Sequence, residues 1–219
     1  MDFDFSELSR RAIYRLLVDT VVPRPIAFVT TVNESGGRNA APFSFFNVMG
    51  HDPPIVVLGL EQRRDGRLKD TAANVRATHA FVVNLVSEEL AQAMNLCSAD
   101  LEPWVDEPAL VGLEMVPSTR VSVPRLAAAP ASLECEEMMS IGLGEGRTLV
   151  VGKVLALHVE DRYYDRAGER VRTADMHLVA RMHGSGWYAR TSDLFLLERP
   201  DAAALAAAAE QDRGDVEDR

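Results

Sequence analysis

The chain has 219 residues, of which 47% are hydrophobic and 26% charged, and its formal net charge is −10. This length suits a single domain with a substantial core, and the acidic balance argues against a general binder of nucleic acid or of anionic membranes. The only cysteines, Cys97 and Cys135, are too few for a disulfide framework or a Cys-rich zinc site, so we expect two reduced, buried and inert thiols. The acidic N-terminus and the lack of a long apolar run predict a cytoplasmic chain without signal peptide or transmembrane helix.

The first part of the chain reads as one short helix followed by strands. Apolar residues recur at helical spacing over residues 6–18, with Ser6 or Asp4 as a cap, and the prolines at 23 and 25 end that helix. The segments that then read as strands are Ile26–Val32, Arg38–Val48 and Ile55–Leu60. A turn cluster at 33–37 predicts that the first two form a hairpin.

The rest of the chain alternates in the same way. A helix is expected over Leu68–Thr78 and another from Ser87, its cap, to Cys97, and residues 98–118 read as irregular. Further strands are expected at Phe81–Val86, Leu133–Met139, Thr148–Val159 and Tyr163–Val171. This pattern predicts a mainly β domain with flanking helices, folded as a small closed or half-closed barrel over residues 1–200. Residues 201–219 read as an alanine-rich and then charged tail, partly disordered.

Several familiar sites are not indicated. The glycines of residues 142–146 come before a strand rather than after one, so they predict a hairpin turn and not a dinucleotide-binding loop. The five histidines lack the spacing of metal ligands, and no metal site is predicted.

The segment from Arg63 to Thr71 is a candidate phosphate site. Arg63 and Lys69, one of only two lysines in the chain, supply charge, and Thr71 supplies a hydroxyl and backbone N–H groups at a helix start. The alternative is a solvated charged loop with Asp70 as the helix N-cap.

The segment from Ala41 to Asn47 is a candidate site for an aromatic ring. It puts Ser44 and Asn47 among aromatic residues, which suits a ring that needs a few hydrogen bonds along its edge. A plain core strand with aromatic residues on alternating faces is the alternative.

These residues carry a family resemblance. The run RPIAFVTTVNESGGRNAAPFSFFNVMGHDPP and the later run RRDGRLKDTAANVRATHAFVVNLVSEELAQAMN resemble the flavin reductase-like, FMN-binding split-barrel proteins, which include the flavoredoxin-like flavoproteins. GKVLALHVED and ARMHGSGWYART resemble the last strands of these proteins and the segment that closes over the flavin. The resemblance spans about residues 12–192.

The resemblance implies a homodimer of six-stranded, Greek-key-like split barrels with FMN, or alternatively FAD, near the subunit interface. It implies that the flavin is bound by Thr30, Thr31, Phe43, Ser44, Phe46, Asn47, Arg63, Lys69, Asp70, Thr71, His183, Trp187 and Tyr188. No catalytic residue is assigned, because the flavin would carry the chemistry; His183 is the nearest candidate for such a role.

Three functions remain open from the sequence. The first is an NADH- or NADPH-dependent flavin oxidoreductase that passes hydride from nicotinamide to flavin and serves a monooxygenase partner. The second is a non-catalytic or electron-carrier flavoprotein reduced by a protein partner. The third is a small-molecule binding module on the same barrel, without flavin.

Overall fold

The computed structural model describes residues 1–63, 66–102, 104–144 and 146–202. The helical elements are η1 (Phe5–Glu7), α1 (Arg10–Thr20), α2 (Asp70–Thr78), α3 (Ala91–Leu96), α4 (Glu107–Leu110), η2 (Asp161–Tyr163) and η3 (Thr173–Met176). The strands are β1 (Ala27–Val32), β2 (Arg38–Phe43), β3 (Phe46–His51), β4 (Pro54–Glu61), β5 (Ala80–Asn84), β6 (Met115–Val116), β7 (Arg125–Leu126), β8 (Ala131–Gly142), β9 (Arg147–Val159), β10 (Tyr164–Asp165), β11 (Arg170–Val171), β12 (Val179–Arg181) and β13 (Tyr188–Arg190). The predicted fold class, mainly β with flanking helices, is confirmed.

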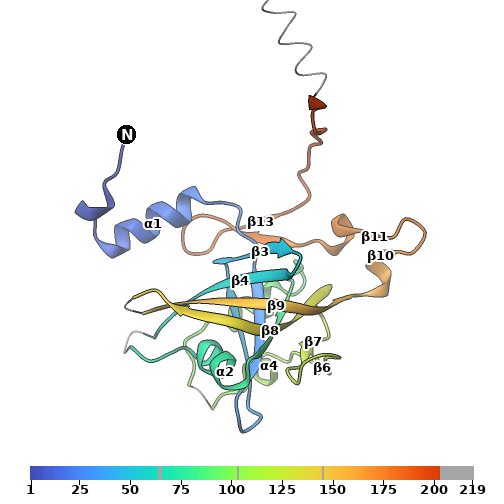
Figure 1. The fold of residues 1–219 in the computed structure, drawn as a ribbon, viewed down its shortest axis with the longest axis horizontal. Helices are drawn as coiled ribbons and strands as arrows, with labels where there is room; N and C mark the ends of the chain where they lie inside the picture. Colours follow the sequence, from blue (N-terminus) through green and yellow to red (C-terminus); the bar gives the residue numbers. More distant parts are fainter. Residues whose placement is uncertain (64–65, 103, 145, 203–219) are drawn as a thin grey trace, which may run out of the picture.

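The largest unit is an antiparallel sheet of seven strands in the order β2-β1-β5-β8-β9-β4-β3. β1–β2, β3–β4 and β8–β9 are hairpins of consecutive strands. The connection from β4 through α2 to β5 crosses from one side of the sheet to the other (Figure 1). The sheet curls without closing, so β2 and β3 remain its two edges, as in a split barrel.

The prediction of one strand over Arg38–Val48 is wrong. The chain turns at Ser44 and Phe45, so β2 and β3 are separate strands at opposite edges of the sheet, and the sheet has one strand more than expected. The Gly59 N–H donates to the Phe45 carbonyl at 2.7 Å, which holds this turn against β4. Pro42 in β2 lacks an N–H donor, and an edge strand tolerates that loss.

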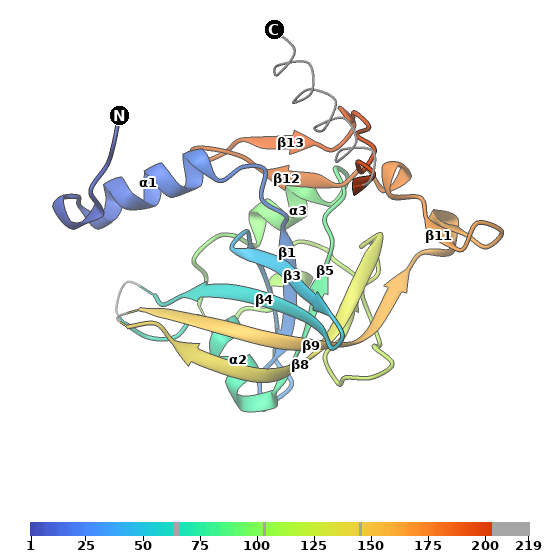
Figure 2. The same ribbon diagram turned by 45° about the horizontal axis from the view of Figure 1, so that its top comes forward.

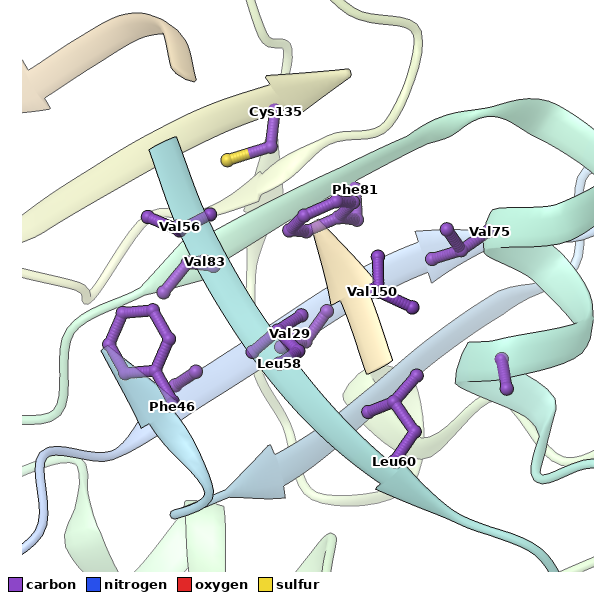
Figure 3. Packing of buried hydrophobic residues seen from close by; sticks show 12 residues of the cluster. Val29, Phe46, Val56, Leu58, Leu60, Val75, Phe81, Val83, Cys135 and Val150 are labelled. Atoms are coloured by element: carbon purple, nitrogen blue, oxygen red, sulfur yellow. The ribbon is translucent and has the colours of Figure 1, made fainter. Parts of the chain in front are cut away.

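The interior of the curled sheet is apolar. Phe81 and Leu58 are fully buried there with valines of β1, β4, β5 and β9, and Phe46 points into the same cluster (Figure 3). Cys135 lies in this core and Cys97 in a second cluster beneath α3. Both thiols are free and buried, as predicted, and burial raises the pKa of Cys97 to about 12.

The helices differ from the prediction mainly at their ends. α1 is capped by Ser9, which accepts from the Ala12 N–H, whereas Asp4 caps the preceding η1 turn. α3 begins at Ala91 although Ser87 accepts from the Leu90 N–H as expected of a cap. Residues 98–118, expected to be irregular, contain α4 and β6.

The remaining segments cover the two sides of the sheet. α1 and the β12–β13 hairpin lie together on one side and α2 lies on the other (Figure 2). The predicted hairpin turn at 142–146 joins β8 to β9, and the predicted hairpin near 163–171 is formed by β10 and β11. Glu145, within the first of these turns, lies outside the described residues. The predicted tail also lies outside them from residue 203 onward. Within the described ranges, no helix is both long and apolar enough to span a bilayer.

Candidate functional site

Beside a cavity of about 760 Å³ that Phe45 lines, three smaller adjoining cavities lie at the turn between β2 and β3. Their volumes are about 250, 210 and 160 Å³, and Pro42 and Phe43 line all three. We call them the Lys69 cavity, the Arg181 cavity and the Glu61 cavity, after one residue that lines each. Because the turn joins the two edges of the sheet, the opening of the split barrel is where these cavities form.

The Lys69 cavity lies at the start of α2. Lys69 takes the N-cap position, which the alternative of a solvated loop gave to Asp70, and among the described residues no side chain caps the helix. The first N–H groups of the helix are therefore available to a ligand, and they favour an anion. Lys69 itself is exposed, and among the described residues no carboxylate forms an ion pair with it.

Thr71 lines this cavity from the first turn of α2. Its side chain is 1% exposed, and its Oγ1 lies 3.1 Å from the side-chain amide of Asn39. α2 itself is fixed to the sheet from below, because the Asn74 amide donates to Thr31 Oγ1 at 3.0 Å. This contact holds the helix start at the cavity.

Arg63 lies at the cavity with its charge already partnered. Its guanidinium donates to Asp70 Oδ2 at 2.7 Å and to the Leu101 carbonyl at 3.0 Å, and it lies 3.7 Å from Asp100. Arg63 therefore ties the loop before α2 to the segment after α3. Of the two bases expected here, Lys69 is the one without an ion-pair partner in the part of the chain that the structure describes.

Glu107 also lines the Lys69 cavity, and the sequence did not indicate this residue. Its carboxylate accepts from the Ala40 N–H at 3.3 Å and lies 3.2 Å from the Asn39 amide. Burial raises the pKa of Glu107 to about 7, and nearby Asp70 adds to the effect. The alternation of side chains along β2 does indicate another part of the cavity lining. Asn39, Ala41 and Phe43 lie two residues apart, so they share one face of the strand, and all three line the cavity.

Arg24 is a second residue that the sequence did not indicate. It is 6% exposed, and its guanidinium donates to the Val18 and Val21 carbonyls, both at 2.7 Å, and to Ser44 Oγ at 3.3 Å. A fourth contact, to the Met182 carbonyl at 3.1 Å, reaches the turn that follows β12. Arg24 thus joins the end of α1, the turn beside Phe43 and the C-terminal hairpin.

Four of the residues expected to bind the flavin line none of the three cavities. Thr30 is fully buried and donates to the Pro124 carbonyl at 2.8 Å, and Thr31 is buried beneath α2. Phe46 is a core residue (Figure 3). Asn47 is exposed on β3, where its Oδ1 accepts from the Val48 N–H.

The three expected residues of the C-terminal part lie on or beside the β12–β13 hairpin. Tyr188 lines the Arg181 cavity. His183 and Trp187 are exposed in the connecting turn, where their rings stack with centroids 6.2 Å apart. Among the residues that the structure describes, no group of three His, Cys, Asp or Glu side chains is arranged to hold a metal ion.

Comparison with known proteins agrees with this architecture. The model of the flavin reductase-like domain matches residues 19–173. An uncharacterised protein of Deinococcus radiodurans is 45% identical over 202 residues, which cover 90% of this chain and 88% of that protein.

Solved structures match nearly the whole chain as well. The 2-nitrobenzoate 2-nitroreductase NbaA of Pseudomonas fluorescens is 36% identical, with a TM-score of 0.84 and coverage of 92% of this chain and 98% of that one. Component B of nitrilotriacetate monooxygenase from Bacillus cereus is 30% identical, with a TM-score of 0.85 and coverage of 90% and 98%. A putative flavin reductase with a split-barrel domain from Shewanella frigidimarina shares the fold at 17% identity, with a TM-score of 0.78 and coverage of 91% and 100%.

Proposed function

Because the chain belongs to the flavin reductase-like family, we propose that it is an NAD(P)H-dependent flavin oxidoreductase that binds FMN beside Phe43. Family membership makes it a flavin-related oxidoreductase; the choice of FMN and of a nicotinamide donor is our proposal. The observation that carries it is the start of α2, where Lys69 has no ion-pair partner among the described residues, next to a polar cavity that Phe43 borders.

The phosphate of FMN would be held by Lys69 and the first N–H groups of α2. Both are donors, and a charge-assisted contact to phosphate is among the stronger hydrogen bonds. Three acids also line the cavity, and their effect is limited: Asp70 is paired with Arg63, Asp100 is 73% exposed, and the raised pKa of Glu107 reduces its charge near neutral pH. The residues present therefore fit one phosphate group.

The ring of the flavin would lie along Phe43 and Ser44 in the Glu61 cavity, which Lys69 also lines. Phe43 lines all three cavities, so it can face both the phosphate end and the ring end of one ligand. Arg24 holds Ser44 in place from behind. When bound, FMN supplies the capacity to accept a hydride from a nicotinamide. The tasks left to the chain are to orient the ring and to keep one face of it open.

We further propose that the protein acts as a homodimer that uses the outer face of β8, β9, β4 and β3. Met139, Val151, Val57 and Asn47 are in register across these strands. Met139 is 55% exposed and both valines are partly exposed, although their strands also bury an apolar inner face. A sheet that is apolar on both faces needs a second cover. Asn47 would bring the flavin site close to that interface.

Anaerobic mixing of the FMN-loaded protein with NADH and, separately, with NADPH tests the proposal. We expect the flavin absorption band to bleach with at least one donor, at a rate that saturates with donor concentration. Bleaching by dithionite but by neither nicotinamide would contradict the proposed donor.

That second outcome would favour the alternative, an electron-carrier flavoprotein that a protein partner reduces. The likeness to a monooxygenase component favours the first function and also suggests a monooxygenase as the partner that uses the reduced flavin. The two free, buried thiols suit the reducing cytoplasm, where we expect the protein to act.

A further inference from the structure

The Arg181 cavity has no role in holding the phosphate of FMN. It measures about 210 Å³ and is lined by the aromatic residues Tyr14, Phe43 and Tyr188. Arg181 is the one charged side chain among the lining residues. The volume is below the roughly 300–1,000 Å³ that drug-sized ligands fill, so it suits a single substituted ring.

Arg181 presents its guanidinium to this cavity in a fixed orientation. The guanidinium carbon lies 4.8 Å from the centroid of the Tyr188 ring, and one nitrogen donates to the Gly184 carbonyl at 3.3 Å. Stacking occupies the face of the guanidinium and leaves N–H groups in its plane for acceptors. Such an edge matches the two oxygens of a carboxylate.

A second positive charge lies directly behind the cavity wall. Arg24 pairs with Arg181 through two backbone hydrogen bonds of 3.0 and 2.9 Å, and its guanidinium contacts Ser44, which lines the cavity. Burial lowers the pKa of Arg24, and the charge of Arg181 lowers it further. The two like charges are therefore close enough to repel each other.

Among the described residues, no carboxylate forms an ion pair with either of these two arginines, whereas Arg190 on the adjacent strand is bonded to Glu88. Asp19 raises the pKa of Arg24 through space and so offsets part of the effect of Arg181, but its carboxylate accepts from the Gly184 N–H at 2.8 Å. A bound anion would relieve the repulsion between the two arginines.

We propose that the Arg181 cavity binds a planar aromatic carboxylate, with the carboxylate on Arg181 and the ring between Phe43 and Tyr188. The aromatic lining selects a flat apolar body, and the guanidinium edge selects the negative group. The inference deepens the proposed function, on which it rests for the neighbouring flavin, by naming the class of the second ligand.

Calorimetric titration with benzoate and benzamide, on FMN-free and on FMN-saturated protein, tests this inference. We expect saturable binding of benzoate in at least one of the two forms and binding of benzamide at least tenfold weaker. Equal binding of the two probes, or no binding of benzoate to either form, would overturn the proposal. Competition by inorganic phosphate at concentrations equal to those of benzoate would also overturn it. The site would then recognise the negative charge alone and not the aromatic ring.

Variants locate the contact. Arg181→Met should weaken benzoate binding at least tenfold and leave benzamide binding unchanged. Arg181→Lys should weaken benzoate binding less, because lysine keeps the positive charge although it lacks the two parallel N–H donors of the guanidinium. Arg190→Met is the matched control on β13 and should bind benzoate like the wild type. Loss of benzoate binding in this control equal to that in Arg181→Met would overturn the assignment to Arg181.

FMN titration of the same samples separates the two proposals. FMN binding without benzoate binding would leave the proposed function standing and remove the carboxylate site. Benzoate binding without FMN binding would do the reverse.

Discussion

Lys69 is distinguished from the other bases near the β2–β3 turn by the freedom of its charge. Arg63 is held by Asp70 and Arg24 by main-chain carbonyls. Lys69, at the N-cap position of α2, has neither kind of partner among the described residues. Its ammonium group is thus free to meet a phosphate that also accepts from the start of the helix.

Replacement of Lys69 by alanine should therefore weaken FMN and spare riboflavin. We expect FMN affinity to fall by about 1.5 kcal/mol, roughly tenfold, which is the low end for a charged hydrogen bond because Lys69 is exposed. Flavin fluorescence titration with both ligands measures the difference. Lys153→Ala, the only other lysine and an exposed residue of β9, is the control. An equal loss for riboflavin would show that Lys69 does not hold the phosphate.

Glu134 is the residue that most clearly sets the acid stability of the fold. It is fully buried, and its carboxylate accepts from the backbone N–H groups of Thr119 and Arg120 and contacts His158. Burial alone would raise the pKa of Glu134, but these hydrogen bonds outweigh it and lower the pKa to about 2. The carboxylate therefore fixes the 119–121 loop against β8 only while it is ionised.

The sign of the pH dependence follows from this lowered pKa. The contribution of Glu134 is fully present above about pH 4.5, its unfolded value, and is lost as the pH falls toward 2. Glu134→Gln should lower the free energy of unfolding at pH 7 by about 3 kcal/mol. The difference from wild type should shrink on acidification, as urea unfolding at several pH values would measure. A difference that stays constant from pH 7 to pH 3 would contradict the account.

Sequence reasoning reached some of these residues and could not reach others. Phe43 and Lys69 were predictable, because an aromatic strand and a basic helix start are local signals. The pairing of Arg63 with Asp70, and the arrival of Glu107 at Asn39, depend on how distant segments meet. Arg24 also falls in this second group, because its buried guanidinium is explained only by the carbonyls around it.

At the scale of elements, the turn between β2 and β3 depends on the absence of a side chain in β4. A Cβ atom added to Gly59 would lie 3.1 Å from Phe45 Cβ, and the Gly59 N–H already holds the Phe45 carbonyl. The turn can therefore lie directly on the sheet, where it forms the cavities around Phe43.

A larger residue at this position should displace the turn. Gly59→Val is expected to lower the free energy of unfolding by about 1–3 kcal/mol through overpacking and to weaken FMN binding at the same time. Gly142→Val, at the end of β8 where an added Cβ meets nothing within 4 Å, is the control. Thermal unfolding and FMN titration of both variants would measure the effect, and wild-type FMN affinity in Gly59→Val would argue against a role for the turn.

The elements were predicted best where one periodic signal prevails. Residue type, together with the glycines and prolines that flank each segment, correctly identified the strands at Ile26–Val32 and Ile55–Leu60 and the turn at 142–146. The segment Arg38–Val48 was misread because apolar and aromatic residues continue on both sides of Ser44, and its one proline, Pro42, lies within β2 and not in the turn. The contact with Gly59, which fixes that turn, joins residues far apart in the chain.

For the whole molecule, the outer face of β8, β9, β4 and β3 predicts the state of association. Met139→Asp would put a charge in the middle of this apolar face and should convert a dimer to monomers, as measured by light scattering after gel filtration. Leu110→Asp, on the exposed face of α4, is the control and should leave the mass unchanged. A wild-type protein that is monomeric at micromolar concentration would contradict the dimer.

The barrel class followed from the number and spacing of the strands, but the opening of the barrel did not. The opening results from β2 and β3 remaining unpaired edges joined by one turn, which is a property of the folded sheet. The three cavities lie at that turn, so local sequence patterns could not predict their position either.

We propose that one FMN molecule binds at this opening, with its phosphate at Lys69. Titration of the purified protein with FMN, followed by flavin fluorescence and absorption, tests it most directly. We expect saturation at one FMN per chain, with affinity at least tenfold above that for riboflavin. An unchanged flavin signal, or equal affinity for the two flavins, would contradict it.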